Sequence, residues 1–138
     1  MKHTILVADD RDTIQKIVKI YVEKLKEDLN FNDEVELIEC KDEKDINDLI
    51  TQHKPVLTLL DFNLSENKTG YDLSKEIKDA CGSKILMMYG TFDTVEESLF
   101  QESGVNDHIV KPFDGINFLN QLHQLLEDIK EEIRFTVP

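Results

Sequence analysis

The chain alternates short, mostly apolar runs with longer amphipathic stretches. Runs this short, without a polar residue at every second position, are typical of strands buried on both faces of a parallel sheet. The central run leads directly into an aspartate, Asp61. We therefore expect five strands, at residues 4–8, 35–38, 56–60, 85–89 and 108–110.

Apolar residues spaced three or four positions apart follow the runs, which predicts a helix after each strand. The fourth helix has the weakest apolar stripe, Val95, Leu99 and Phe100, and is expected to be the easiest to move. The last helix is expected at about 114–134, before a short tail at 135–138. Its stripe contains Ile116, Leu119, Leu122, Leu126, Ile129 and Ile133.

Polar residues and glycines beside the runs indicate where the helices begin and end. The expected caps are two pairs in capping-box spacing, a single aspartate and a C-terminal glycine: Asp12 with Gln15, Asp93 with Glu96, Asp42, and Gly82. Gly70 is expected to supply the backbone freedom that the turn into the third helix needs.

Strands that alternate with helices require right-handed crossovers, which place every strand's C-terminal end at one edge of a parallel sheet. The pattern therefore predicts one three-layer α/β domain over residues 1–138. A chain of this length can bury a core without disulfides or metals. Ligands of open α/β sheets bind at this edge, so its residues are the site candidates.

Three acids and a lysine are expected to meet there. Asp9 and Asp10 follow the first strand, Asp61 the third and Lys111 the fifth. A turn or a helix cap would explain any one acid, but not the convergence of all four groups. Neighbouring carboxylates raise one another's pKa unless a cation shares the site, and all-oxygen ligands favour Mg²⁺ or Mn²⁺. A carboxylate can attack phosphorus beside such a metal while a lysine balances charge, which predicts phosphoryl transfer to an aspartate.

Composition narrows the choice of partners. A net charge of −13 repels nucleic acid and anionic membranes, and no cluster of lysines and arginines suggests a basic patch. The two cysteines, Cys40 and Cys81, have no metal-ligand spacing and fit a reducing cytosol. The N-terminal apolar run is too short for a signal peptide, and no stretch is long enough to span a membrane. We expect a soluble, cytoplasmic protein.

The motifs ILVADD at 5–10, LLDFN at 59–63, Gly70, and KPF at 111–113 resemble the receiver domain of two-component response regulators. The resemblance extends over essentially the whole chain. It implies a flavodoxin-like (βα)5 fold with the parallel strand order 2-1-3-4-5. It also implies a domain that catalyses at most its own phosphorylation and dephosphorylation, and a cis bond between Lys111 and Pro112.

The same resemblance implies a role for each acid of the motif. Asp61 becomes the phosphoacceptor, and Lys111 contacts the phosphoryl group. Asp10, with Asp9 beside it, becomes a metal ligand together with Asp61, and the backbone carbonyl of Asn63 completes the protein's contribution to the Mg²⁺ (or Mn²⁺) site.

Two positions depart from the family pattern. Tyr89 stands where the family has a serine or threonine, and His108 stands where it has a tyrosine or phenylalanine. Both residues of the usual switch pair are therefore altered. Thr91 could bend back to offer its hydroxyl to the phosphoryl group, although a solvent-facing Thr91 is the expected arrangement. The loop from Asp61 to Gly70 is also one residue longer than in the family.

Three functions stay open at this point. The first is a phosphorylated signalling switch, and the second is a pseudo-receiver interaction module that is read without phosphorylation. Tyr89 and His108 favour the second, whereas the acid cluster favours the first. The third is a haloacid-dehalogenase-type phosphatase, which needs a second acid two residues after the nucleophile. That position is Asn63, which cannot transfer the proton.

As a receiver, the chain is expected to take its phosphoryl group from a histidine kinase or a phosphotransfer protein. Its output partner is expected to bind the face formed by the fourth helix, the fifth strand and the fifth helix. A homodimer stays open, as does the choice between a stand-alone regulator and one domain of a longer protein.

Overall fold

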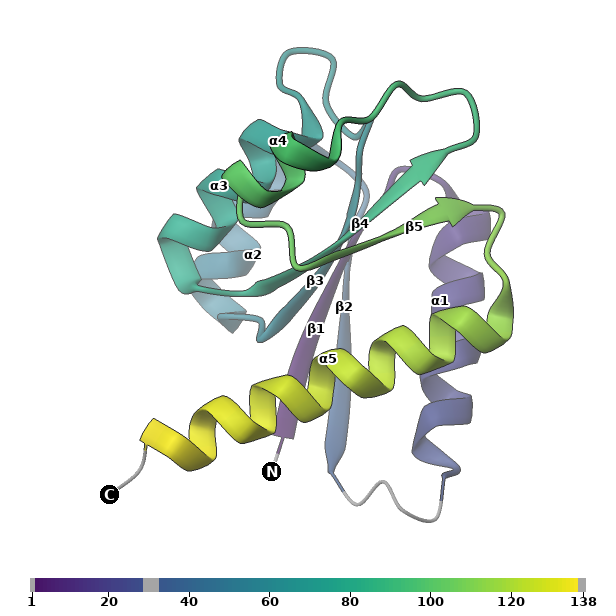
Figure 1. Ribbon diagram of the computed structural model, residues 1–138, viewed down its shortest axis with the longest axis vertical. Helices are drawn as coiled ribbons and strands as arrows, with labels where there is room; N and C mark the ends of the chain where they lie inside the picture. The colour runs from purple at the N-terminus through teal and green to yellow at the C-terminus, as the bar shows by residue number, and fades with distance from the viewer. Residues whose placement is uncertain (1, 29–32, 137–138) are drawn as a thin grey trace.

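The computed structural model describes residues 2–28 and 33–136 and shows alternating strands and helices (Figure 1). The strands within these residues are β1 Lys2–Ala8, β2 Glu34–Cys40, β3 Leu57–Asp61, β4 Lys84–Gly90 and β5 Asp107–Lys111. The helices are α1 Asp12–Lys26, α2 Ile46–His53, α3 Gly70–Cys81, α4 Glu97–Glu102 and α5 Gly115–Thr136, with a 3₁₀ turn at Glu43–Asp45 before α2. The predicted alternation is confirmed.

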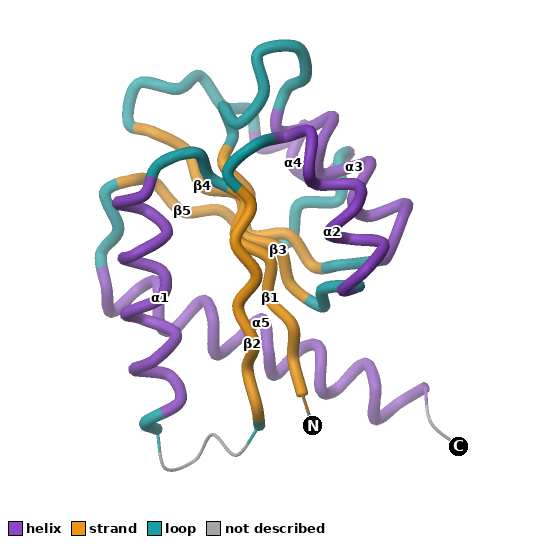
Figure 2. Tube along the Cα trace, turned by 180° about the vertical axis from the view of Figure 1, so that it is seen from behind, coloured by secondary structure: helices purple, strands orange, loops and turns teal. Residues whose placement is uncertain are grey.

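The strands pair in parallel in the order β2-β1-β3-β4-β5, which is the flavodoxin-like order that the resemblance implied. Helices α1 and α5 cover one face of the sheet, and α2, α3 and α4 cover the other (Figure 2). Because all strands run the same way, their C-terminal ends share one edge, and the loops that leave this edge stand together.

Strand β3 has no exposed residue, which explains why its sequence lacks alternation. Leu57 and Leu59 pack with α1 and α5, whereas Leu60 packs with α2 and α3. Thr58, a polar residue in the middle of the strand, shares a hydrogen bond of 2.9 Å with Ser83. The strand therefore contributes to both cores and carries Asp61 to the edge of the sheet.

The predicted cap of α1 is wrong in its details. The residue that precedes the helix is Arg11, and its side chain makes no capping hydrogen bond. Gln15 is buried, and its amide donates to the carbonyl oxygens of Val7, Asp9 and Cys40 at 3.0, 3.0 and 3.3 Å. These carbonyls lie at the ends of β1 and β2, so the side chain fixes the sheet edge instead of the helix end.

The caps expected from Asp42 and Asp93 also differ. Asp42 accepts a hydrogen bond from the Lys44 amide and so caps the 3₁₀ turn that leads into α2. Helix α4 starts only at Glu97, and its preceding residue makes no side-chain cap. Asp93 lies in the preceding loop, where its carboxylate binds other partners that are described below.

The two glycines of α3 have different roles. Gly82 ends the helix in the left-handed conformation at φ 68°, as predicted. Gly70 is the first helical residue, and it allows close packing instead of a special turn, because a Cβ atom there would lie 3.0 Å from the Cα atom of Phe62 and 3.1 Å from the sulfur of Met87. The cap that precedes it is a capping box formed by Thr69 and Asp72.

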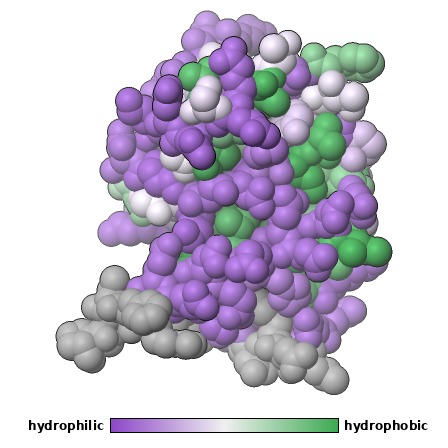
Figure 3. Space-filling view, viewed as in Figure 1, coloured by the Kyte–Doolittle hydropathy of each residue, from purple (hydrophilic) through white to green (hydrophobic). Residues whose placement is uncertain are grey.

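The surface matches the acidic composition. The face seen in Figure 3 is mostly hydrophilic, with scattered apolar residues. No helix among residues 2–28 and 33–136 has the length and apolar character needed to cross a lipid bilayer. Both cysteines carry free thiols, and burial raises the pKa of Cys40 to about 11.

Two apolar residues at the start of α5, Ile116 and Phe118, differ strongly in how far they are buried. Ile116 was predicted to belong to the apolar stripe, but its exposed fraction is 74%, whereas Phe118, which lies outside that stripe, is fully buried at 0%. The ring of Phe118 stacks on Phe113 at 4.8 Å and meets Tyr21 edge-on at 5.6 Å. The helix therefore enters the core through its aromatic residue.

We expect Phe118→Ala to lower the free energy of unfolding by about 3–5 kcal/mol, because it leaves a cavity among packed rings. Ile116→Ala, the control in the same helical turn, should change it by less than about 0.5 kcal/mol. Urea titration followed by circular dichroism measures both. Equal losses for the two variants would contradict the packing described here.

Candidate functional site

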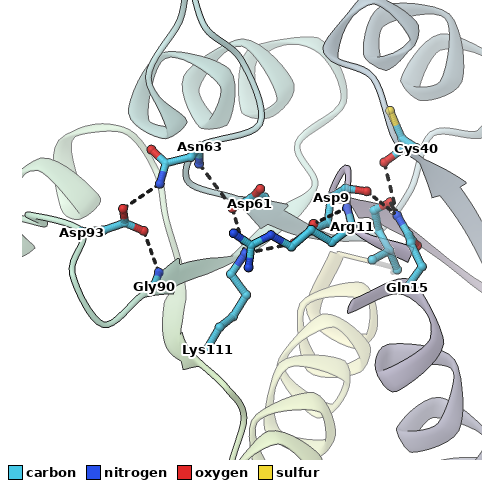
Figure 4. A network of polar contacts seen from close by, with 10 residues as sticks. Asp9, Arg11, Gln15, Cys40, Asp61, Asn63, Gly90, Asp93 and Lys111 are labelled. Atoms are coloured by element: carbon cyan, nitrogen blue, oxygen red, sulfur yellow. Dashed lines mark hydrogen bonds and ion pairs between the residues drawn. The ribbon is translucent and has the colours of Figure 1, made fainter. Parts of the chain in front are cut away.

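Asp9, Asp61 and Lys111 meet at the C-terminal edge of the sheet (Figure 4), and Asp10 lies beside them. Asp9 directly follows β1, Asp61 is the last residue of β3 and Lys111 is the last residue of β5. The Lys111 ammonium donates to Asp9 Oδ2 at 3.1 Å and to Asp61 Oδ1 at 3.0 Å. Asp9 and Asp61 are buried, whereas Asp10 is exposed. The edge thus holds two buried carboxylates bridged by one cation, with a third carboxylate open to solvent.

Backbone geometry fixes Asp9 in this position. Its Oδ1 atom accepts a hydrogen bond of 2.9 Å from the Arg11 amide, and its own carbonyl accepts the Gln15 side chain. The sequence analysis assigned Gln15 to a capping box and missed this role. The signal that could have revealed it is its place beside Ile14 and near Val18, on the buried side of the helix, where a polar side chain needs a buried partner.

The electrostatics of the site favour a cation. Burial raises the pKa of Asp9, and the negative charge of Asp61 adds to this effect, whereas the Arg11 amide and Lys111 oppose it. One ammonium group cannot neutralise three carboxylates. Ligand oxygens of Asp9, Asp10 and Asp61 all lie within 4.8 Å of one another, a spacing that one divalent ion can bridge. An all-oxygen site of this kind suits Mg²⁺ or Mn²⁺.

A cavity of roughly 600 Å³ opens above these groups. Its polar wall includes Asp10, Asp61 and Lys111, and its apolar wall includes Ile14 and Phe113. The cavity is therefore large enough for a small phosphorylated group beside the acids, and its lining combines charged and apolar side chains.

Asn63 lies beside Asp61, and the role of its backbone carbonyl as a metal ligand stays a prediction. Its backbone amide approaches Asp61 Oδ1 at 3.3 Å. Its side-chain amide donates to Asp93 Oδ1 at 2.6 Å, and the other oxygen of Asp93 accepts from the Gly90 amide at 2.6 Å. Asp93 was predicted only as a helix cap, so its presence at the site is a finding of the structure. Asp93 is held at the site by its hydrogen bond with the amide of Gly90 at the end of β4, and the sequence does not show that this amide needs an acceptor.

Thr91 is exposed, and its hydroxyl donates to the carbonyl oxygen of Lys111 at 3.4 Å. It therefore has the solvent-facing position that was expected, and it tethers the loop after β4 to the end of β5. It lines the same cavity as Asp61.

Tyr89 and His108, the two residues that depart from the family pattern, lie together beneath α4. The ring of His108 stacks on Phe100 at 5.0 Å, and Tyr89 lies 5.8 Å from His108 and 6.3 Å from Phe100. Tyr71 extends the cluster to Phe100 at 5.5 Å. Both residues are half-buried packing partners of one aromatic cluster.

Comparisons with known proteins agree with this geometry. The family described as "Response regulator receiver domain" matches residues 5–127. The transcriptional regulatory protein SrrA of Staphylococcus aureus is 26% identical over 126 residues, which cover 91% of this chain and 48% of that protein. The chain thus spans about half the length of the curated relatives that it matches.

Solved structures show the same fold at low identity. The signal receiver domain of a putative Luxo repressor protein from Vibrio parahaemolyticus has a TM-score of 0.83 at 16% identity, with 100% of both chains covered. A putative response regulator from Chloroflexus aurantiacus has a TM-score of 0.75 at 22% identity and covers 92% of this chain and 99% of its own. NtrX from Brucella abortus has a TM-score of 0.78 at 23% identity, over 99% of this chain and 29% of NtrX.

We expect Mg²⁺ to stabilise the folded chain, by about 1.4 kcal/mol when its concentration is ten times its dissociation constant. Without metal, the buried Asp9 carboxylate opposes folding above its raised pKa and has no such effect below its ordinary value of 3.8. The gain from Mg²⁺ should therefore be full at neutral pH and disappear as the pH falls through the raised pKa, because protons compete for the same oxygens.

Thermal unfolding with and without Mg²⁺, between neutral pH and pH 4, measures this gain. Asp10→Asn should reduce it, whereas Asp12→Asn, which removes an exposed carboxylate paired with Lys41, should leave it unchanged. An equal gain in the wild type and Asp10→Asn would show that the cation binds elsewhere.

Proposed function

The chain belongs to the response regulator receiver domain family, and from this premise we propose that it is a single receiver domain whose phosphoacceptor is Asp61. The phosphoryl group would come from a histidine kinase or a phosphotransfer protein, with Mg²⁺ (or Mn²⁺) as the cofactor. The observation that carries the proposal is the meeting of Asp9, Asp10 and Asp61 within 4.8 Å, with the Lys111 ammonium 3.0 Å from Asp61.

The acceptor needs a nucleophilic oxygen that a phosphoryl donor can reach. Asp61 has one oxygen bonded to Lys111, and it borders the open cavity. One carboxylate oxygen attacks the phosphorus of a phosphohistidine, and the new O–P bond forms as the P–N bond breaks. The electron pair of that bond returns to the imidazole nitrogen, which is then protonated. The product is an acyl phosphate on Asp61.

Lys111 and a bound metal ion would offset the negative charge of the transferred phosphoryl group. Lys111 lies close enough to Asp61 to contact the transferred group and balance part of its charge. Asp9, Asp10, Asp61 and the backbone carbonyl of Asn63 would hold the metal, which supplies positive charge to the phosphoryl oxygens when it is bound. Because a cluster of three carboxylates repels an incoming phosphate, this charge is needed for the reaction.

The output would be read on the face formed by α4, β5 and α5. Helix α4 has six residues and one buried side chain, Phe100, so little packing energy holds it in place. Val110 of β5 and Ile116 of α5 expose apolar surface on neighbouring elements, which a partner protein or a second copy of the chain could cover. We place this signalling in the cytoplasm. The relative SrrA is a transcriptional regulatory protein, and an output of that kind is a proposal for any longer protein that contains this chain.

A pseudo-receiver module is the second candidate, and the packing of Tyr89 and His108 favours it. Both rings already contact Phe100, so the space that a usual switch pair would open and fill is occupied. A partner could then read this surface in a single state. The two candidates differ in whether Asp61 is modified and in whether the modification changes the α4 and β5 surface.

We expect acetyl phosphate with Mg²⁺ to add one phosphoryl group to the chain, because Asp61 offers an oxygen beside a cation site. Intact mass spectrometry measures the addition, and Asp61→Ala should abolish it. Asp79→Asn, which removes an exposed acid on α3, is the charge-matched control and should be modified as the wild type is. No mass change in the wild type, or equal modification of Asp61→Ala, would leave the pseudo-receiver function as the better account.

Tyr89→Thr tests whether the aromatic cluster limits the switch. Threonine removes a half-buried ring from beside His108 and Phe100, so these rings gain room to move. We expect the amide chemical shifts of β5 and α4 to change more on adding beryllofluoride and Mg²⁺ to this variant than to the wild type. Identical shift changes would show that the ring at Tyr89 does not restrain the surface.

A further inference from the structure

The Gly90 amide is the first donor of β4 beyond the end of β3. Asp61 pairs with Met88 in the register of these strands, and the Phe62 amide donates to the Met88 carbonyl at 2.8 Å. In a parallel ladder, every second residue bonds to the same neighbour, so the Gly90 amide faces the β3 side as Met88 does. Strand β3 has ended there, and the Gly90 amide lies at the site edge without a ladder partner.

Asp93 supplies the missing acceptor. Its Oδ2 atom accepts the Gly90 amide at 2.6 Å, while its Oδ1 atom accepts the Asn63 side-chain amide at 2.6 Å (Figure 4). The Asp93 amide also donates to the Gly90 carbonyl at 3.0 Å, which closes a tight turn. A Cβ atom at position 90 would lie 3.3 Å from the carboxylate, so glycine permits this close approach. One carboxylate therefore joins the loop after β4 to the loop after β3.

This carboxylate lies on the cavity that contains the acceptor. Asp61, Lys111, Gly90 and Asp93 all line the same cavity. An anionic group attached to Asp61 needs hydrogen-bond donors around its oxygens, and the Gly90 amide is a donor of the right kind on the wall of the cavity. It is already bonded to an anion that belongs to the chain. The carboxylate of Asp93 also adds negative charge beside the cavity, which must accept the further negative charge of a group attached to Asp61.

We propose that Asp93 is an internal competitor of the anion that Asp61 carries. In the unmodified chain Asp93 occupies the Gly90 amide and, through Asn63, ties down the loop of residues 91–96. An anion on Asp61 takes the Gly90 amide, displaces Asp93 and frees that loop. This inference rests on the proposed function and adds a means of regulating the Asp61 site.

The freed loop leads directly into α4. The Glu96 amide, just before α4, donates to the Tyr71 hydroxyl at 2.9 Å, and α4 buries only Phe100. The displacement of Asp93 therefore loosens the attachment of the most weakly packed helix at its N-terminal side. A signal can pass to the α4 surface by this route although Tyr89 and His108 already pack against Phe100.

The test compares the affinity of beryllofluoride, a phosphoryl mimic, in the presence of saturating Mg²⁺. The proteins are the wild type, Asp93→Ala, Asp93→Asn and Asp79→Asn. Because the chain has no tryptophan whose fluorescence could report binding, isothermal titration calorimetry or NMR measures the affinity. We expect Asp93→Ala to bind about tenfold more tightly, because it frees a donor that is bonded to a charged acceptor. Asp93→Asn keeps an acceptor oxygen but loses the charge, so its affinity should be intermediate.

Asp79→Asn removes the same charge from the far end of α3 and should bind as the wild type does. In the wild type, beryllofluoride should also shift the side-chain amide resonances of Asn63, which lose Asp93 as their acceptor. Thermal unfolding of each variant establishes that it is folded before titration.

Two results would overturn the inference in different ways. If the wild type binds beryllofluoride and Asp93→Ala binds no more tightly than Asp79→Asn, Asp93 does not compete and the proposed function stands alone. If neither the wild type nor Asp93→Ala binds it, the proposed phosphoacceptor function fails, and the inference fails with it.

Discussion

The arrangement of this molecule depends on one ion pair network, in which the Lys111 ammonium lies between the carboxylates of Asp9 and Asp61. Both acids are buried, and two unpaired carboxylates at adjacent strand ends would oppose the packing of β1 against β3. Lys111 comes from β5, two strands away from β3 in the sheet order. The network therefore links the ends of β1, β3 and β5 across the end of β4, and any change of charge on Asp61 acts on all of them.

The fold could be predicted from the sequence because the inner strands β1, β3 and β4 are largely buried on both faces. Such strands appear as unbroken apolar runs, and the alternation with helices leaves only a parallel sheet with right-handed crossovers. The order of the strands came from the resemblance, since periodicity does not encode it. Helix caps were predicted less well for a physical reason. Gln15 and Asp93 have the spacing of caps, but stronger partners outside the helix, the buried carbonyls and the Gly90 amide, bind them instead.

The site could be predicted in part for the same reason. Once the strands are parallel, Asp9, Asp61 and Lys111 must share an edge, so their convergence follows from topology. The role of Asp93 does not follow, because it depends on which amide of β4 is left without a partner where β3 ends. The packing of Tyr89 and His108 on Phe100 could not be predicted either. It depends on the position of α4, a six-residue helix whose sequence has only a weak apolar stripe.

A switch needs contacts that differ between its two states, because a ligand shifts an equilibrium only by its difference in affinity for them. Rings that are packed in the unmodified chain cannot supply that difference by filling an empty space. Under this proposal, the contacts that an anion on Asp61 would change are those of two donors on the same cavity, the Lys111 ammonium and the Gly90 amide at the end of β4. Lys111 is held by a second buried acid, Asp9, and has little freedom to move. The Gly90 amide can exchange one anion for another, so the free energy of modification would reach α4 most directly through the loop that Asp93 now holds.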